Sequence, residues 1–214
     1  MKKIKVVIIT STKGSILREL IKNNISDRVY EVISDRNCSA IELAKKNKIK
    51  THVYKTVDMK LFSDYIYNRY KDKKIDFYLI FFTKILEGKL LVIAKNKIIN
   101  SHPALLPTFK GLNAFKKSYY SKNKYYGPTI HFVDKGIDTG TIISKIKLKK
   151  NKINNLNLNR NMVFLLSIGM ILQFIKNFET KEIKILKNKT YILNKNKLFK
   201  YSNKLDKDLL SYFK

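Results

Sequence analysis

The chain contains a single cysteine, Cys38, among its 214 residues. One thiol cannot form an intramolecular disulfide or a zinc site built on paired cysteines, so both stabilising devices are excluded. Long apolar runs are also missing, since none reaches the roughly 18 residues needed to cross a bilayer. The basic start, Met1 to Lys3, is followed by an apolar stretch that ends at Ile9 without a small-residue cleavage site, unlike a signal peptide. We therefore expect a cytoplasmic protein with no membrane segment.

Acidic residues are scarce. The chain has 16 Asp and Glu against 45 Lys and Arg, which gives a formal net charge of +29. Such an excess is typical of proteins that bind nucleic acid through its phosphates. Arginine, which reads bases through paired hydrogen bonds, is nevertheless rare beside lysine, and no zinc-finger, helix-turn-helix or RNA-binding signature is present. We therefore favour compositional drift towards lysine over a dedicated nucleic-acid site. A positive surface would still attract anionic small substrates.

Apolar strands and helix patterns alternate through the N-terminal half. The apolar content of 44% argues against disorder, and the length suits one domain with a substantial core. Strands that are apolar on both faces are typical of a parallel sheet covered by helices. The alternation predicts an α/β fold with an open, mainly parallel, Rossmann-like sheet and flanking helices. The predicted strands are 4–10, 29–34, 51–54 and 75–82, and the helix patterns cover 16–21, 40–47 and 59–70.

The second half has a different pattern. Two strands, 127–133 and 141–148, are joined by a loop, and a long helix follows from about 156 to 178. The tail from Ile183 suggests two short strands and then a basic segment, 195–214. We expect a single domain with three parts, which are a Rossmann-like half, a second half and a basic tail. Their bounds are 1–99, 100–180 and 181–214.

Proline, histidine and glycine are rare, and they concentrate in one stretch. All three prolines, two of the three histidines and four of the seven glycines lie between Asn100 and Gly140. Proline and glycine fix turns, while amide, imidazole and carboxylate groups are common components of a polar active site. This stretch is therefore the candidate site.

His102 follows a predicted strand and precedes Pro103, which keeps it out of the helical region and stiffens its turn. Asn100 lies two residues earlier, so in an extended segment its side chain points the same way. An imidazole and an amide placed together can stabilise one developing oxyanion. Asp138, in a glycine-flanked loop, can take up a proton or act on His102 through its charge, and His131 can orient Asp138.

Two other interpretations of these side chains find little support. A zinc site would use His102, His131 and Asp138, but no close ligand pair such as His-x-x-x-His is present. A serine hydrolase would need a nucleophile elbow, and no Gly-x-Ser-x-Gly sequence occurs. We therefore expect no metal.

Four motifs in a fixed order carry a more specific signal. They are Asn-x-His-Pro-x-Leu-Leu-Pro at 100–107, Phe-Lys-Gly at 109–111, Gly-x-Thr-x-His-Phe-Val at 127–133 and Asp-x-Gly-x-Ile-Ile at 138–143. Together they resemble the folate-dependent formyltransferase family, and the resemblance covers most of the chain. It implies the Rossmann-like formyltransferase fold. It also implies transfer of a formyl group from 10-formyltetrahydrofolate, a co-substrate, to a substrate amine.

The resemblance also implies roles for the polar residues. Asn100 and His102 would stabilise the tetrahedral oxyanion, and His102 would deliver a proton to the folate nitrogen. Asp138 would assist proton removal and act on His102, and His131 would support Asp138. The 100–180 half would thus hold the catalytic site and part of the folate site, and further folate contacts would come from the 1–99 half.

The same resemblance implies a folate site. The segment Thr83-Lys84-Ile85-Leu86 would hold the pterin, largely through backbone groups that tolerate side-chain change, so Lys84 in place of the usual arginine should matter little. Asn100 would contribute to the same site, and Lys60 would be a basic folate contact.

The acceptor's phosphate loop departs most from the family, because Gly-Asn-Gly-Ser-Asn is replaced here by Thr-Lys-Gly-Ser-Ile at 12–16. The amides of Gly14, Ser15 and Ile16 at a helix start can still cradle a phosphate, and Lys13 can add charge. The first candidate acceptor is glycinamide ribonucleotide, a phosphoribosyl amine of purine biosynthesis, and an amino-sugar nucleotide is the alternative. A non-catalytic, basic nucleic-acid-binding module on this fold is the alternative of another class. The oligomeric state stays open.

Overall fold

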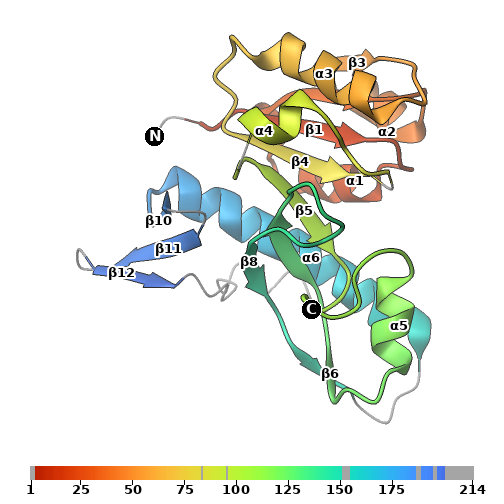
Figure 1. Cartoon of the computed structure of the whole chain (residues 1–214), viewed down its shortest axis with the longest axis vertical. Helices are drawn as coiled ribbons and strands as arrows, with labels where there is room; N and C mark the ends of the chain where they lie inside the picture. Colours follow the sequence, from red (N-terminus) through yellow and green to blue (C-terminus); the bar gives the residue numbers. More distant parts are fainter. Residues whose placement is uncertain are drawn as a thin grey trace. The chain divides into compact units, whose positions relative to one another are not determined.

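The computed structural model describes residues 3–82, 84–94, 96–150, 155–186, 189–194 and 197–200 (Figure 1). The chain divides into two compact units. The first comprises residues 2–100 with 133–135, and the second comprises 101–132 with 136–214. The largest sheet is mixed and has seven strands.

The first unit carries the parallel part of this sheet, in the strand order β3-β2-β1-β4-β5. All four neighbouring pairs are parallel, and Val6 lies opposite Phe77 at one end of the β1–β4 pair while Thr10 lies opposite Phe81 at the other. The prediction that the first four strands share one mainly parallel sheet is therefore confirmed. The strands are β1 (Val6–Thr10), β2 (Val29–Ser34), β3 (Thr51–Val53), β4 (Phe77–Phe81) and β5 (Ile98–His102).

Helices follow the strands because apolar residues recur at helical spacing between them. Every residue of β1 and β4 is buried, as expected for strands covered on both faces. Helix α3 begins after Asp58, whose carboxylate accepts hydrogen bonds from the amides of Lys60 and Leu61. Figure 1 shows α3 beside the short helix α4. The helices are α1 (Ser15–Lys22), α2 (Ser39–Lys46), α3 (Met59–Tyr70) and α4 (Lys89–Ile93).

One charged cluster lies inside the first unit. The side chain of Glu31 on β2 is completely buried, and its carboxylate accepts bonds from Arg69 Nε at 2.9 Å, Arg69 Nη2 at 2.5 Å and Tyr70 Oη at 2.6 Å. Burial alone would raise the pKa of Glu31, but the bonds from Arg69 and Tyr70 and the charge of Arg69 outweigh it and lower that pKa. This cluster ties β2 to the last turn of α3.

The second unit contains antiparallel pairs. Strands β7 and β8 are joined by the loop that carries Asp138, as predicted, and β6 pairs with β9. A small apolar cluster of Phe115, Tyr126 and Val163 packs α5 and β6 against the long helix α6. The elements are α5 (Ala114–Tyr120), β6 (Tyr125–Tyr126), β7 (Thr129–Phe132), β8 (Ile142–Lys145), β9 (Leu148–Lys149) and α6 (Leu156–Glu179).

By length and composition alone, helix α6 is long and apolar enough to cross a membrane. We did not predict this from the sequence, because the helix contains no continuous apolar run of sufficient length. Polar residues such as Ser167 and Gln173 interrupt it, yet both are buried. Of its most apolar 18-residue window, 67% is buried inside the protein. Such burial is typical of a core helix.

The tail differs from the prediction. We expected two short strands after Ile183, and the structure has three, which form an antiparallel sheet in the order β10-β11-β12. The third strand lies within the segment that we interpreted as only basic, because the apolar pair Leu198-Phe199 is flanked by lysines. Residues 195–196 and 201–214 of that segment lie outside the described residues. The strands are β10 (Ile183–Leu186), β11 (Lys189–Asn194) and β12 (Lys197–Lys200).

Candidate active site

The second unit brings His102 and Asp138 together across 36 positions of sequence. His102 is the last residue of β5, and its side chain is 4% exposed. Asp138 lies in the loop between β7 and β8, with its side chain 13% exposed. Nδ1 of His102 is 3.2 Å from Oδ2 of Asp138. An imidazole and a carboxylate thus form a pair that is largely withdrawn from solvent.

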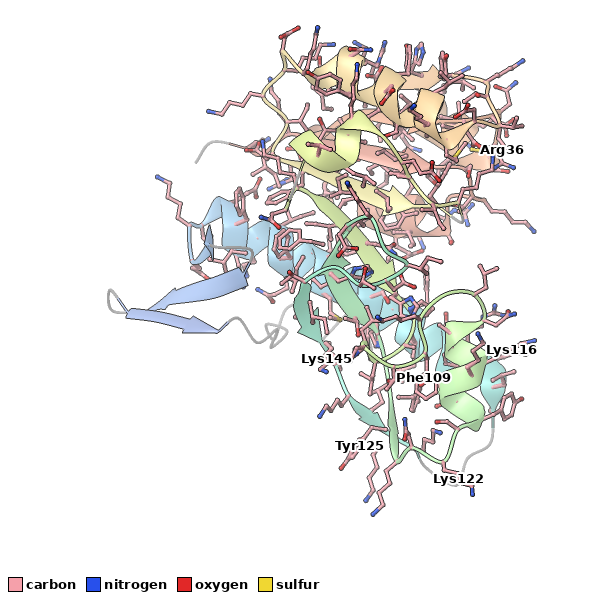
Figure 2. All side chains as sticks on the ribbon, in the orientation of Figure 1. Arg36, Phe109, Lys116, Lys122, Tyr125 and Lys145 are labelled. Atoms are coloured by element: carbon pink, nitrogen blue, oxygen red, sulfur yellow. The ribbon has the colours of Figure 1, made fainter. Side chains whose placement is uncertain are left out.

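Both ring nitrogens of His102 face acceptors. Nε2 lies 2.8 Å from the carbonyl oxygen of Phe109, a residue labelled in Figure 2. A carbonyl can only accept, so this contact places a hydrogen on Nε2. On the other side Nδ1 faces the Asp138 carboxylate, which also accepts when ionised. The imidazole is therefore held at both nitrogens, by Phe109 on one side and by Asp138 on the other.

His131 approaches the other oxygen of the same carboxylate. It lies on β7 with its side chain 2% exposed, and its Nε2 is 3.5 Å from Oδ1 of Asp138. Its Nδ1 lies 2.8 Å from the carbonyl oxygen of Phe132, which fixes the ring orientation. The rings of His102 and His131 meet edge to face, with their centroids 6.5 Å apart. The carboxylate thus contacts two imidazoles.

Asp138 is held ionised by this surrounding. The bond with His102, then that with His131, and the amide of Gly111, which donates to Oδ2 at 2.9 Å, together lower the pKa of Asp138 far below its usual range. Asp138 also has φ 49°, a left-handed conformation that few non-glycine residues adopt. Such backbone strain is characteristic of functional sites.

The loop 109–111 completes the site, and sequence reasoning missed its backbone contacts. Phe109 and Gly111 both have positive φ, 58° and 75°. This conformation turns the Phe109 carbonyl towards His102 and the Gly111 amide towards Asp138. The motif Phe-Lys-Gly was visible, but the sequence does not indicate which backbone groups it presents. The loop therefore contacts both members of the pair, His102 through the Phe109 carbonyl and Asp138 through the Gly111 amide.

Asn100 lies on β5 two residues before His102 and is half-buried. Residues two apart on a strand project to the same face, as we expected from the sequence. The shared oxyanion role that the sequence suggested for them stays a prediction.

The residues predicted to bind the acceptor lie in the first unit, at the turn from β1 into α1. Gly14 precedes α1 with φ 80°, and no side chain caps the first amides of the helix. Ser15 and Lys13 are exposed and Ile16 is half-buried. A Cβ at position 14 would lie 3.0 Å from Cα of Ala40 on α2. Gly14 is therefore required by packing as well as by its φ.

The predicted folate segment also lies in the first unit. Leu86 is buried in its core, Ile85 is 48% exposed, and Lys84 forms an ion pair with Asp35 at 2.9 Å. Thr83 lies outside the described residues. Lys60 is exposed at the start of α3. Its side chain lies close to Gly88, two residues after the segment, since a Cβ added at Gly88 would be 3.4 Å from Cγ of Lys60.

In the part of the chain that the structure describes, no group of three or more His, Cys, Asp or Glu side chains is arranged to hold a metal ion. The contacts of Asp138 with two imidazoles instead form a hydrogen-bonded triad. The chemistry that this triad offers is proton transfer and charge stabilisation.

A family model described as "Formyl transferase" matches residues 4–154 of the chain. The chain belongs to this family. The resemblance drawn from the four motifs is therefore confirmed, and so is the fold that it implied. The matched range includes His102, His131 and Asp138.

Named relatives agree with this assignment. A phosphoribosylglycinamide formyltransferase from Bacillus subtilis is 41% identical over 64 residues, which are 30% of this chain and 33% of that protein. The chain thus aligns with a third of this relative's length. One from Mycobacterium tuberculosis is 30% identical over 148 residues, 66% of this chain and 69% of that protein. The crystal structure of phosphoribosylglycinamide formyltransferase from Anaplasma phagocytophilum has a TM-score of 0.79 and 26% identity, with coverage of 95% of this chain and 100% of that chain.

Proposed function

We propose that this protein transfers the formyl group of 10-formyltetrahydrofolate to the amine of glycinamide ribonucleotide, a step of purine biosynthesis. The observation that carries the proposal is the pair of His102 and Asp138, a buried imidazole whose Nδ1 lies 3.2 Å from a carboxylate with a lowered pKa. The names of the relatives support this acceptor over an amino-sugar nucleotide. We place the reaction in the cytoplasm, with folate and an anionic small molecule as partners and without a metal.

The chemistry requires two proton movements. The amine nitrogen attacks the formyl carbon, a C–N bond forms, and the carbonyl oxygen becomes an oxyanion. Asn100 and His102 stabilise this oxyanion, and the amine loses its proton to a base assisted by Asp138. As the bond from the formyl carbon to the folate nitrogen breaks, His102 delivers a proton to that nitrogen. The reaction then balances as formyl amide plus tetrahydrofolate.

In this scheme His102 must exchange one partner. Its Nε2 hydrogen is bound to the Phe109 carbonyl in the structure described above. The oxyanion is a stronger acceptor than a neutral carbonyl, because charge-assisted hydrogen bonds are about twice as strong. His131 keeps Asp138 oriented during the exchange.

The proposal is tested by supplying 10-formyltetrahydrofolate together with glycinamide ribonucleotide or with an amino-sugar nucleotide, and by identifying the formylated product. We expect formylation of glycinamide ribonucleotide and none of the amino sugar. The opposite result would assign the chain to the alternative acceptor. Salt-dependent nucleic-acid binding without folate binding would instead support a binding module.

We infer that the acceptor's phosphate binds at the start of α1. The amides of Ser15 and Ile16 lie in the first turn of this helix, which has no side-chain cap and no acidic residue. Free amides and the helix dipole favour an anion there. Lys13 adds a positive charge.

A charge at position 15 tests this site without changing Gly14, where a Cβ would come within 3.0 Å of Cα of Ala40. Ser15→Asp should raise the acceptor KM about tenfold, equivalent to about 1.4 kcal/mol, because it opposes the phosphate. The same change should preserve or increase the melting temperature, since an acidic residue is favourable in a first turn. The neutral control Ser15→Asn should change the acceptor KM little. An unchanged acceptor KM in Ser15→Asp would place the phosphate elsewhere.

A further inference from the structure

Asp35 is a buried carboxylate that the proposed reaction does not use. It directly follows β2, and its side chain is 1% exposed. The guanidinium of Arg36 donates to both oxygens at 3.0 Å, and Nζ of Lys84 donates to Oδ2 at 2.9 Å. Burial alone would raise the pKa of Asp35, but these bonds and charges outweigh it and lower that pKa. The carboxylate is too buried to contact a substrate, so any role that it has is exerted through Lys84 or Arg36.

The two partners of Asp35 differ in what they connect. Arg36 is its neighbour in sequence, and its side chain is 49% exposed (Figure 2). Lys84 comes from the segment after β4, 49 positions later, and its side chain is 31% exposed. The bond with Lys84 therefore joins two loops, whereas the bond with Arg36 stays within one.

The strand order shows what this bond spans. Strand β1 lies between β2 and β4, and all three are parallel. Neighbouring strands lie about 4.8 Å apart, so the ends of β2 and β4 are separated by roughly 10 Å. The side chains of Asp35 and Lys84 bridge this distance across the end of β1. The bridge holds the segment after β4 to the body of the unit.

The segment is thereby fixed at two points. Leu86 is buried in the core of the first unit, and Lys84 is anchored on Asp35. Between them Ile85 is 48% exposed, so this position of the segment lies at the surface. We propose that Asp35 is a positioning residue that, through Lys84, fixes the backbone of Lys84-Ile85-Leu86 for folate binding. This inference rests on the proposed function, in which that backbone holds the pterin.

The test separates positioning from direct contact and from mere stability. Lys84→Met removes the bridge but leaves Asp35 paired with Arg36, so the melting temperature should change little. Asp35→Asn removes the anchoring charge. In each variant we expect the dissociation constant of a non-reactive 10-formyl deazafolate, and the folate KM, to rise about fivefold to tenfold, while the acceptor KM stays within about twofold. Lys84→Arg keeps an ion pair with Asp35 and should recover most of the affinity that Lys84→Met loses. Lys46→Met, which removes an exposed lysine on α2, should bind the analogue like the unaltered protein.

Hydrogen exchange supplies a readout that needs no ligand. The amides of Ile85 and Leu86 should exchange faster in Lys84→Met and in Asp35→Asn than in the unaltered protein or in Lys84→Arg. Unchanged exchange in both variants overturns the inference. Weaker analogue binding in Lys84→Met alone also overturns it, because Lys84 would then contact folate directly. If the unaltered protein binds no folate analogue, the proposed function is wrong, and the exchange rates alone decide whether Asp35 holds the segment.

Discussion

Each unit of this protein contains a carboxylate that is contacted by three N–H or O–H groups and has a lowered pKa, yet the two sites differ in kind. Glu31 is fully buried and bonded to Arg69 and Tyr70. Asp138 is slightly exposed and contacts two imidazoles and one backbone amide. Arginine stays protonated at all relevant pH values, whereas imidazoles exchange protons near neutrality. We therefore interpret a buried, ionised carboxylate as part of a catalytic site only where its partners can gain or lose a proton.

Backbone conformation separates the two sites in the same way. Glu31 lies within the regular strand β2, and its side chain needs no unusual geometry. Asp138 is held at φ 49° in a loop, next to the clamp of Phe109 and Gly111 at positive φ. The first arrangement stabilises the fold, and the second arrangement holds in a strained backbone conformation the groups that we propose act on a substrate.

The largest effect that separates the sites should appear in catalysis. His102→Ala and Asp138→Ala should each lower kcat by a factor equivalent to about 3–4 kcal/mol of barrier, because the oxyanion loses its donor or that donor loses its partner. Folate binding and the melting temperature should stay close to those of the unaltered protein. Steady-state kinetics and analogue binding measure both quantities. Full activity in either variant would show that the pair of His102 and Asp138 does not act in catalysis.

The next effect should appear in stability alone. Glu31→Gln leaves Arg69 without its counter-charge in a largely buried position, so the free energy of unfolding should fall by about 2–3 kcal/mol. The kcat of the folded protein should not change. The control Glu31→Leu with Arg69→Met removes both charges and should recover much of the loss, since an apolar pair can replace a buried ion pair. A lowered kcat in Glu31→Gln, measured well below its melting temperature, would show that the two units are not separable in function.

A smaller effect is expected at His131, which contacts Asp138 at the longer distance of 3.5 Å. His131→Gln should lower kcat about tenfold, equivalent to about 1.4 kcal/mol, because Asp138 keeps its bonds to His102 and Gly111. Neither KM should change by more than about twofold. A loss as large as that in Asp138→Ala would make His131 an equal member of the site.

The smallest effect is a change with pH in the contribution of Glu31 to the free energy of unfolding, and it is absent near neutral pH. The folded-state pKa of Glu31 lies below its ordinary value of 4.5, so its contribution to stability is complete above that value and is lost as the pH falls through the folded-state pKa. The difference in unfolding free energy between the unaltered protein and Glu31→Gln should therefore be constant from about pH 6 to 8 and shrink below about pH 4.5. Denaturant titrations at several pH values measure it. The pH profile of kcat should keep its shape in Glu31→Gln and change in Asp138→Ala.

The parallel part of the fold could be predicted because its signals are local. Helix α3 was predicted at its observed bounds, since apolar residues recur there at helical spacing. The cap that Asp58 supplies in the structure agrees with this start. Strand β4 was predicted a residue or two too long at each end, because Ile75 and Phe82 are as apolar as the strand itself. The third strand of the tail was missed because lysines flank its two apolar residues.

Contacts between distant positions could not be predicted in the same way. Glu31 stands in an apolar strand, and nothing near it in sequence indicates that Arg69, 38 positions later, will pair with it. The motifs did identify His102, His131 and Asp138 as one group. They did not indicate that Phe109 and Gly111 act through backbone atoms, because any residue type offers those atoms.

The close approach of Gly14 to Ala40 has a consequence for engineering. A Cβ at position 14 would combine an unfavourable φ with an approach of 3.0 Å to Cα of Ala40 on α2, so a library of variants should return glycine there far more often than any other residue. If the acceptor's phosphate binds at this loop, as we propose, acceptor preference is to be altered through positions 12, 13 and 15, where side chains can be exchanged one at a time. Ala40 lies far from the loop in sequence, yet its contact with position 14 restricts which residues can stand there.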